Sequence, residues 1–240
     1  MSGAFDYVRS NLASVRARLE RAARDAGRDP AAIRLVAVSK TFPIEAVLAG
    51  SEAGQVDFGE NRVQEALQKL EATAGTPLRW HLIGHLQSNK AKKAAASFPW
   101  IQSIDSLDLL RRIDRAAAEA GTTPDLLLQA DLAGEETKFG AGEATVAGMI
   151  REPLTAARIR GLMILPPYAE NPEDVRPWFR RLVALRDQLL QEGVPPDRLQ
   201  ELSMGMSHDF EVAVQEGSTM VRVGSAIFGE RRPAAGTENG

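Results

Sequence analysis

Lys40 directly follows a short apolar run, and it is the residue at which we first expect chemistry. Residues 35–38 are apolar and predict a strand buried on both faces, as in a parallel sheet. Lys40 would then stand at the C-terminal end of that strand, where α/β barrels place their functional groups. Partial burial favours the neutral amine, which attacks aldehydes to form a Schiff base. The simpler alternative is a solvated loop lysine, because lysines are mostly exposed.

Serines and glycines near the C-terminus form a candidate phosphate site. Ser207 follows a predicted strand at 199–204, while Gly224 and Ser225 lie in a predicted strand at 220–228. Barrels often bind phosphate with the loops after strands seven and eight, where backbone amides and hydroxyl groups donate hydrogen bonds. Ser207 could also cap the helix that follows it, and the two roles can coexist.

Arg222 is a lone cation within the apolar stretch that predicts the eighth strand. A buried arginine needs a partner, because burying its charge unpaired is costly. That partner could be a carboxylate of a neighbouring strand or the pyridine nitrogen of a cofactor. Since arginine stays protonated, such a nitrogen would have to act as an acceptor, which weakens the ring as an electron sink. An amine, a phosphate site and this arginine together suggest that Lys40 carries pyridoxal 5'-phosphate (PLP).

Two histidines lie in a predicted strand at 78–86, and a third is His208. His81 and His85 would share one face of that strand, roughly 13 Å apart, which is too far for the zinc pairing that a helix allows. No cluster of acidic residues accompanies them, so we expect no metal site. We expect one histidine to line the cavity and the other to be structural.

Two other polar stretches have both a structural and a binding interpretation. Asn61 follows a predicted strand at 56–59, and it could cap the next helix or present its amide to a ligand. Lys90, Lys92 and Lys93 are expected to form a solvated helix face, with a second cofactor or phosphate site as the alternative.

The composition excludes several classes of function. The chain of 240 residues has no cysteine, which rules out disulfides, thiolate catalysis and cysteine zinc sites and fits a cytoplasmic protein. Its net charge of -3 indicates no general nucleic-acid footprint. The N-terminal region lacks the apolar core of a signal peptide, and no stretch approaches the roughly 18 apolar residues of a membrane span. We therefore expect neither nucleic acid nor membrane as a partner.

Alternating strand-like and helix-like stretches predict a (β/α)8 barrel with an additional amphipathic helix at 5–26. An open doubly wound sheet is the alternative, but its G-x-G-x-x-G turn is missing after the first strand. We expect one domain at 1–230 and a disordered tail at 231–240. The predicted strands are 34–40, 56–59, 78–86, 100–104, 125–132, 157–165, 199–204 and 220–228. The predicted helices between them are 44–53, 61–73, 88–97, 106–120, 143–152, 172–192 and 209–216.

These motifs, taken together, resemble the pyridoxal phosphate homeostasis proteins, which are relatives of the N-terminal barrel of bacterial alanine racemase. The resemblance covers nearly all of the chain except its tail. The matching stretches are Val38-Ser39-Lys40-Thr41, Phe58-Gly59-Glu60-Asn61, Trp80 through Lys90, Gly161-Leu162-Met163, Ser203 through Asp209 and Val221 through Gly229.

The resemblance implies a fold-type III PLP barrel with Lys40 as the Schiff-base lysine and Arg222 near the pyridine nitrogen. It places Ser207, Gly224 and Ser225 at the phosphate, and Asn61 and His81 in the wall of the pocket. Ser225 stands where the family often has threonine, which keeps the hydroxyl group. Asp131 stands where many members have asparagine. Members are thought to regulate intracellular PLP, so PLP-dependent apoenzymes are expected partners of a monomer or homodimer.

A slow PLP-dependent amino-acid racemase is the alternative function. Racemisation needs an acid or base on each face of the substrate α-carbon, and Lys40 supplies one. Alanine racemases take the other from a tyrosine of a second domain, which we expect to be absent because this chain ends just after strand eight. Only Tyr7 and Tyr168 remain, and Tyr168 is expected in an exposed loop near the barrel mouth. We therefore expect a cofactor carrier without turnover.

Overall fold

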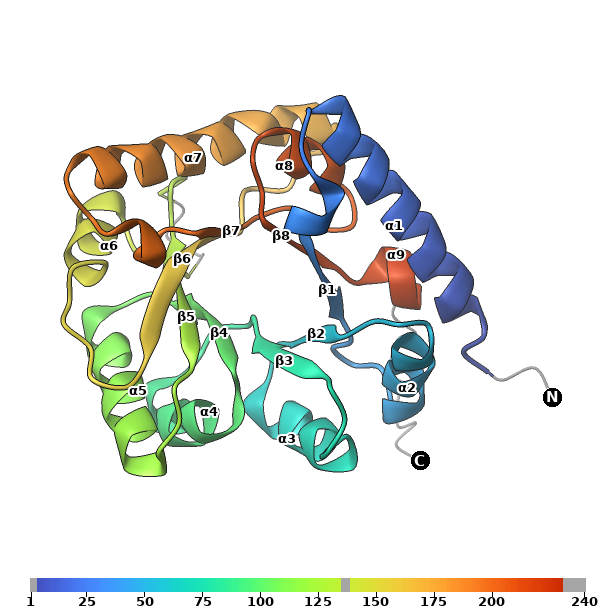
Figure 1. The fold of residues 1–240 in the computed structure, drawn as a ribbon, viewed down its shortest axis with the longest axis horizontal. Helices are drawn as coiled ribbons and strands as arrows, with labels where there is room; N and C mark the ends of the chain where they lie inside the picture. The colour runs from blue at the N-terminus through green and yellow to red at the C-terminus, as the bar shows by residue number, and fades with distance from the viewer. Residues whose placement is uncertain (1–3, 135–138, 231–240) are drawn as a thin grey trace, which may run out of the picture.

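The computed structural model describes residues 4–134 and 139–230 of the chain. In this part, eight parallel strands follow one another in chain order around a closed barrel, and β8 pairs with β1 to complete it (Figure 1). The strands are β1 (Arg34–Val38), β2 (Asp57–Glu60), β3 (Arg79–Leu82), β4 (Trp100–Ile104), β5 (Asp125–Ala130), β6 (Arg158–Ile164), β7 (Glu201–Ser203) and β8 (Met220–Val223). The predicted fold class is therefore confirmed.

Helices connect the strands on the outside of the barrel, and α1 (Tyr7–Asp25) crosses the outer surface beside α8 and α9 (Figure 1). Its apolar residues recur every three or four positions, so one face of the helix is buried while the other meets solvent. The other α-helices are α2 (Ile44–Glu52), α3 (Val63–Ala72), α4 (Ala91–Ser97), α5 (Leu107–Ala120), α6 (Glu143–Met149), α7 (Arg176–Gln191), α8 (Phe210–Gln215) and α9 (Ser225–Phe228). Short 3-10 turns are η1 (Pro30–Ala32), η2 (Ser88–Lys90), η3 (Pro172–Val175) and η4 (Pro196–Arg198).

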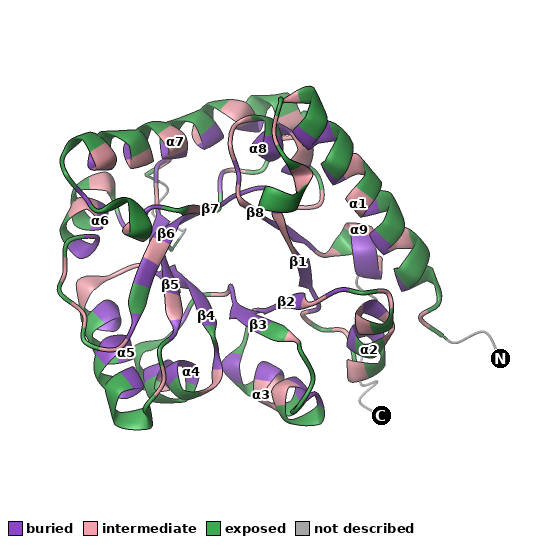
Figure 2. Ribbon diagram, in the orientation of Figure 1, coloured by how far each residue is buried: buried purple, intermediate pink, exposed green. Residues whose placement is uncertain are grey.

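The apolar core has two parts, because parallel strands are covered on both faces. The large part lies between the strands and the helices, and Figure 2 shows the strands mostly buried while the outer helix surfaces are exposed. The small part lies inside the barrel and consists of Val36, Trp100, Leu127, Met163 and Met220. Several buried polar side chains share the barrel interior with it, and they matter for the site below.

The C-terminal part of the predicted eighth strand is wrong. β8 ends at Val223, Gly224 turns the chain, and residues 225–228 form the short helix α9. The apolar run at 226–228 is compatible with a strand or a buried helix, and periodicity alone does not separate the two. The predicted tail at 231–240 lies outside the described residues.

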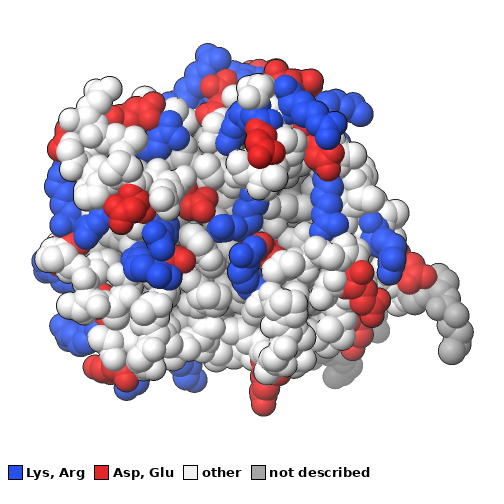
Figure 3. All heavy atoms as spheres, viewed as in Figure 1, with Lys and Arg blue, Asp and Glu red and all other residues white. Residues whose placement is uncertain are grey.

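Lys, Arg, Asp and Glu side chains are interspersed on the face of the molecule shown in Figure 3. None of the described helices is both long and apolar enough to cross a membrane. Within residues 4–134 and 139–230, no group of three or more His, Asp or Glu side chains is arranged to hold a metal ion.

Candidate functional site

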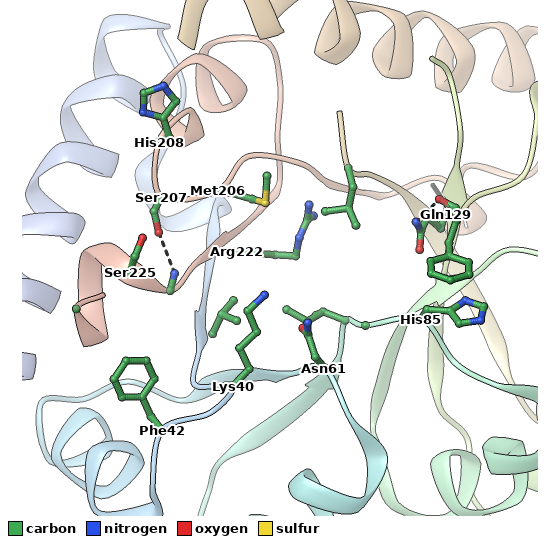
Figure 4. Close-up of a pocket in the computed structure, with 17 residues that line it drawn as sticks. Lys40, Phe42, Asn61, His85, Gln129, Met206, Ser207, His208, Arg222 and Ser225 are labelled. Carbon is green, nitrogen blue, oxygen red and sulfur yellow. Dashed lines mark hydrogen bonds between the residues drawn. The ribbon is translucent and has the colours of Figure 1, made fainter. Parts of the chain in front are cut away.

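A cavity of about 640 Å³ opens at the C-terminal ends of the strands. Its volume is in the range of small-molecule and cofactor sites. Six of the seven predicted cofactor residues line it, namely Lys40, Asn61, Ser207, Arg222, Gly224 and Ser225. In the view of Figure 4, Ser207 and Ser225 lie on one side of Lys40 and Arg222, while His85 and Gln129 lie on the other. The fold thus gathers residues that are nearly 190 positions apart in the sequence.

Lys40 lies two residues beyond the end of β1, and its side chain extends into the cavity (Figure 4). The next residue, Thr41, has a positive φ of 70°. A β-branched residue rarely adopts this conformation because its side chain crowds the backbone. The Thr41 amide donates to Glu65 Oε1 at 2.6 Å, which holds the turn that follows Lys40.

A buried ion pair lies behind the Lys40 turn. Lys69 Nζ donates to Glu60 Oε1 at 2.6 Å and to the Ser39 carbonyl at 2.9 Å. The Ser39 hydroxyl donates to the same Glu60 oxygen at 2.7 Å. Burial raises the pKa of Glu60, with hydrogen bonds from Lys69 and Ser39 opposing that shift. Among the described residues, nothing bonds the other carboxylate oxygen, Glu60 Oε2, which is also buried.

Sequence reasoning missed this cluster of Ser39, Glu60, Lys69 and Glu65. Glu60 sits in the Phe58–Asn61 stretch, where only Asn61 was considered. A charged residue directly after a short predicted strand was the available signal, because a carboxylate that becomes buried there requires a partner. The sequence does not indicate that α3 supplies that partner as Lys69.

The candidate phosphate end of the cavity is built around Ser207. Its Oγ accepts a hydrogen bond from the backbone N–H of Gly224 at 3.1 Å (Figure 4). It also accepts one from the backbone N–H of Ala226 at 3.3 Å. Gly205, with φ of 94°, allows the preceding turn, because a Cβ there would lie 2.5 Å from the Ala213 side chain. Backbone donors and hydroxyl groups therefore converge at one end of the cavity.

Arg222 lines the cavity although it is only 3% exposed. Nη1 donates to Ser203 Oγ at 2.6 Å, and Nη2 donates to the Ile164 carbonyl at 2.8 Å. Burial lowers the pKa of Arg222 to about 10, opposed by the nearby Asp209 carboxylate, so the guanidinium stays charged at neutral pH. Both acceptors are neutral, which differs from the ion pair with a neighbouring strand that the sequence left open.

The two histidines of the third strand have the roles that we predicted, but in the reverse order. His85 lines the cavity, where its ring stacks on Phe139 with centroids 3.6 Å apart. His81 is not among the lining residues, because it is fully buried in the barrel interior and bonded to Asp57 and Gln102. Since β3 ends at Leu82, strand alternation does not extend to His85, and the cavity begins beyond the level of His81.

The remaining candidates divide between the cavity and the surface. Asn61 lines the cavity and is not the N-cap of α3, since Arg62 holds that position. Asp131 does not line the cavity, and its Oδ1 accepts from the amides of Ala133 and Gly134. Tyr168 is 79% exposed and does not line the cavity.

Of the three-lysine cluster, Lys92 is exposed and forms a surface ion pair with Glu119. None of Lys90, Lys92 and Lys93 lines the cavity. Lys138 lies outside the described residues.

Comparison with known proteins gives close relatives over nearly the whole chain. The profile of the alanine racemase N-terminal domain matches residues 10–232. The pyridoxal phosphate homeostasis protein of Aquifex aeolicus is 43% identical over 223 residues, covering 92% of this chain and 97% of the relative. That of Pseudomonas aeruginosa is 42% identical over 228 residues, covering 93% and 96%.

Solved structures agree with these sequence matches. PipY of Synechococcus elongatus, solved with PLP bound, is 40% identical with a TM-score of 0.81, covering 92% of this chain and all of PipY (100%). Alanine racemase of Clostridium difficile is 14% identical with a TM-score of 0.68, covering 97% of this chain and 59% of the racemase, and it shows the shared barrel alone. The extent and identity of the sequence matches establish that this chain belongs to the pyridoxal phosphate homeostasis protein family.

Proposed function

We propose that this protein binds PLP in the cavity at the C-terminal end of the barrel, attaches it to Lys40 and takes part in intracellular PLP homeostasis. One observation carries the proposal: an amine, a buried guanidinium and a cluster of hydroxyl and amide donors line a single cavity. The names of the relatives and the PLP-bound structure of PipY support the same function.

The donor set fits the chemical groups of PLP. The hydroxyl groups of Ser207 and Ser225 suit a phosphate, because a phosphate accepts several hydrogen bonds. The amides of Gly224 and Ala226, which donate to Ser207 Oγ in this structure, hold that hydroxyl group at this end of the cavity. Arg222 would donate to the pyridine nitrogen, and Asn61 would contribute an amide to the pocket wall. When bound, PLP supplies an aldehyde that condenses with a lysine amine with loss of water.

The protein's own residues favour holding the cofactor over using it. Arg222, which is charged at neutral pH, keeps a facing ring nitrogen in its acceptor form, which weakens electron withdrawal by the ring. A racemase would also need a second acid or base opposite Lys40. Tyr168 is exposed and outside the cavity lining, so it does not supply that group in this structure. We therefore propose binding without turnover, in the cytoplasm, with transfer to PLP-dependent apoenzymes.

The test compares wild type, Lys40→Ala and Lys92→Ala after incubation with PLP. We expect a long-wavelength absorbance band in wild type and in Lys92→Ala. Borohydride reduction should attach PLP irreversibly to the peptide that contains Lys40 in both proteins. Lys40→Ala should lose both signals. A wild-type protein without the band would refute PLP binding, and a band that persists in Lys40→Ala would move the attachment to another lysine.

Turnover is tested separately. With PLP bound, the protein should exchange the Cα proton of L- or D-alanine for deuterium no faster than Lys40→Ala does. Rapid exchange that depends on Lys40 would contradict a carrier without turnover and favour the racemase.

A further inference from the structure

A continuous chain of hydrogen bonds crosses the barrel interior from Asp57 to Arg222. Asp57 Oδ1 lies 2.9 Å from His81 Nε2, and His81 Nδ1 lies 3.0 Å from Gln102 Nε2. Gln102 Oε1 accepts from Ser203 Oγ at 2.7 Å, and Ser203 Oγ accepts from Arg222 Nη1 at 2.6 Å. Five strands, β2, β3, β4, β7 and β8, each contribute one member.

With a neutral His81, the two ends of the chain determine the direction of every hydrogen bond in it. Arg222 can only donate, so the Ser203 proton is available for Gln102 Oε1. The Gln102 amide nitrogen then donates to His81 Nδ1, which must carry no proton. His81 therefore holds its proton on Nε2 and donates it to the Asp57 carboxylate. The alternative is an imidazolium with the Gln102 amide reversed, because a neutral ring protonated on Nδ1 would turn a bare Nε2 toward Asp57.

The surroundings of His81 favour its neutral form. His81 is fully buried and stacks on Trp100, with ring centroids 5.5 Å apart. Burial lowers the pKa of His81, with the hydrogen bond and the charge of Asp57 opposing that shift. Two further cations, Arg34 and Arg79, also act against a charge on the ring, and Arg79 donates to Asp57 Oδ2 at 2.7 Å.

We infer that His81 is a positioning residue for Arg222: as the neutral Nε2–H tautomer it accepts from Gln102, and through Gln102 and Ser203 it orients the guanidinium that faces the cavity. The inference deepens the proposed function, on which the link to PLP rests. The Ile164 carbonyl anchors Nη2, so Ser203 holds the second terminal nitrogen of the fork. Gln102 Nε2 also donates to Met220 Sδ at 2.9 Å, and a thioether sulfur is a weak acceptor. Without an acceptor at His81 Nδ1, this weak bond alone holds the Gln102 amide nitrogen, and Ser203 is then held less firmly beneath Arg222.

The first experiment needs no PLP. Nitrogen NMR of the unloaded protein at neutral pH should show three histidine rings, of which the ring lost in His81→Asn is neutral, with a protonated Nε2 and a bare Nδ1. An imidazolium or the Nδ1–H tautomer at His81 would overturn the inference. This result is independent of whether PLP binds.

The second experiment separates the two bonds of His81 by substitution. In His81→Asn the amide oxygen replaces the Nδ1 acceptor, so the link to Gln102 is kept while that to Asp57 is lost. In His81→Gln the amide reaches the Nε2 position, so the link to Asp57 is kept and the acceptor for Gln102 is lost. His81→Leu removes both. Ile101→Ala, at a fully buried core residue of β4 outside the chain, controls for general loss of stability.

We expect His81→Leu and His81→Gln to weaken PLP binding about tenfold, as for members of one hydrogen-bond network, and to shift the pH titration of the bound absorbance band. His81→Asn and Ile101→Ala should stay within about twofold of wild type. Equal affinities and titrations for His81→Leu and Ile101→Ala would overturn the inference. If wild type itself fails to bind PLP, the proposed function is refuted. The tautomer measurement still tests the direction of the hydrogen bonds between Asp57 and Arg222.

Discussion

Lys40 and Arg222 line the same cavity, but they are supported in different ways. Behind Lys40 lies a compact charged cluster, in which Lys69 joins Glu60 and Glu65, and one buried carboxylate oxygen has no hydrogen-bond partner among the described residues. Beneath Arg222 lies the linear chain, whose three central members are neutral and each bonded on both sides. Breaking the charged cluster should lower the stability of the protein, whereas the hydrogen-bond chain mainly determines the orientation of the Arg222 guanidinium.

The difference follows from what each side chain requires. A flexible lysine needs only a rigid backbone at its base, which the cluster provides by bonding to Ser39 and Thr41 on either side of Lys40. The planar guanidinium of Arg222 needs acceptors in fixed directions. A charged pair gives strong but weakly directional attraction, while a chain of neutral donors and acceptors fixes direction.

The largest effect should come from removing Lys69. Lys69→Met leaves the buried Glu60 carboxylate without its cation, and we expect a loss of roughly 3–5 kcal/mol in the free energy of unfolding, measured by urea denaturation. The double variant Lys69→Met with Glu60→Leu should recover much of that loss, because no charge is then left buried. A double variant no more stable than Lys69→Met would contradict this account of the cluster.

The second largest effect should come from acid, which protonates His81 in the hydrogen-bond chain beneath Arg222. The pKa of His81 in the folded protein is below its ordinary value of 6.5, so between these values the unfolded chain binds a proton that the folded protein does not. Stability should therefore fall as the pH drops below 6.5, by up to about 1.4 kcal/mol per pH unit for this one proton. Urea denaturation across the pH range should show this slope in wild type and a flatter one in His81→Asn. An unchanged slope in the variant would show that His81 is not the group whose protonation lowers the stability.

The cluster behind Lys40 should respond to pH in the opposite direction. The pKa of Glu60 is raised above its ordinary value of 4.5, so above that value the folded protein retains a proton that the unfolded chain has released. This contribution to stability is present below pH 4.5 and is lost as the pH rises through the folded pKa. Glu60→Gln keeps the neutral form at every pH and should remove that decline from the stability curve. Identical curves for Glu60→Gln and wild type would argue against a protonated Glu60.

The smallest effect should come from the strained turn after Lys40. Thr41→Gly removes the side chain that opposes a φ of 70°, and we expect a gain of less than about 1 kcal/mol, since glycine also loses more conformational freedom on folding. Thr41→Ala keeps a Cβ at the same φ and should gain less. Thermal unfolding of the two variants measures the difference, and a glycine variant no more stable than the alanine variant would mean that the turn stores no strain.

The fold and most of the site were predictable because they depend on local patterns. Apolar runs at regular intervals predicted the strands, and the positions of Lys40, Ser207 and Arg222 relative to strand ends predicted their meeting in one cavity. The predicted strand at 220–228 was too long because its apolar end suits a strand or a helix. The roles of His81 and His85 were exchanged because β3 ends at Leu82, four residues before the end of the predicted strand, so that His85 lies beyond the strand and lines the cavity.

The sequence by itself determined the fold class, and it predicted Lys40, Arg222 and the phosphate candidates as neighbours in one cavity, since each is marked by residue type and by its place at a strand end. Only the tertiary structure decided what supports them. The partners of Glu60, His81 and Arg222 come from other segments of the chain, the most distant being the Ile164 carbonyl, 58 positions from Arg222. Hydrogen bonds inside a barrel depend on register and on the direction of each side chain, which are set only when all eight strands close around the core.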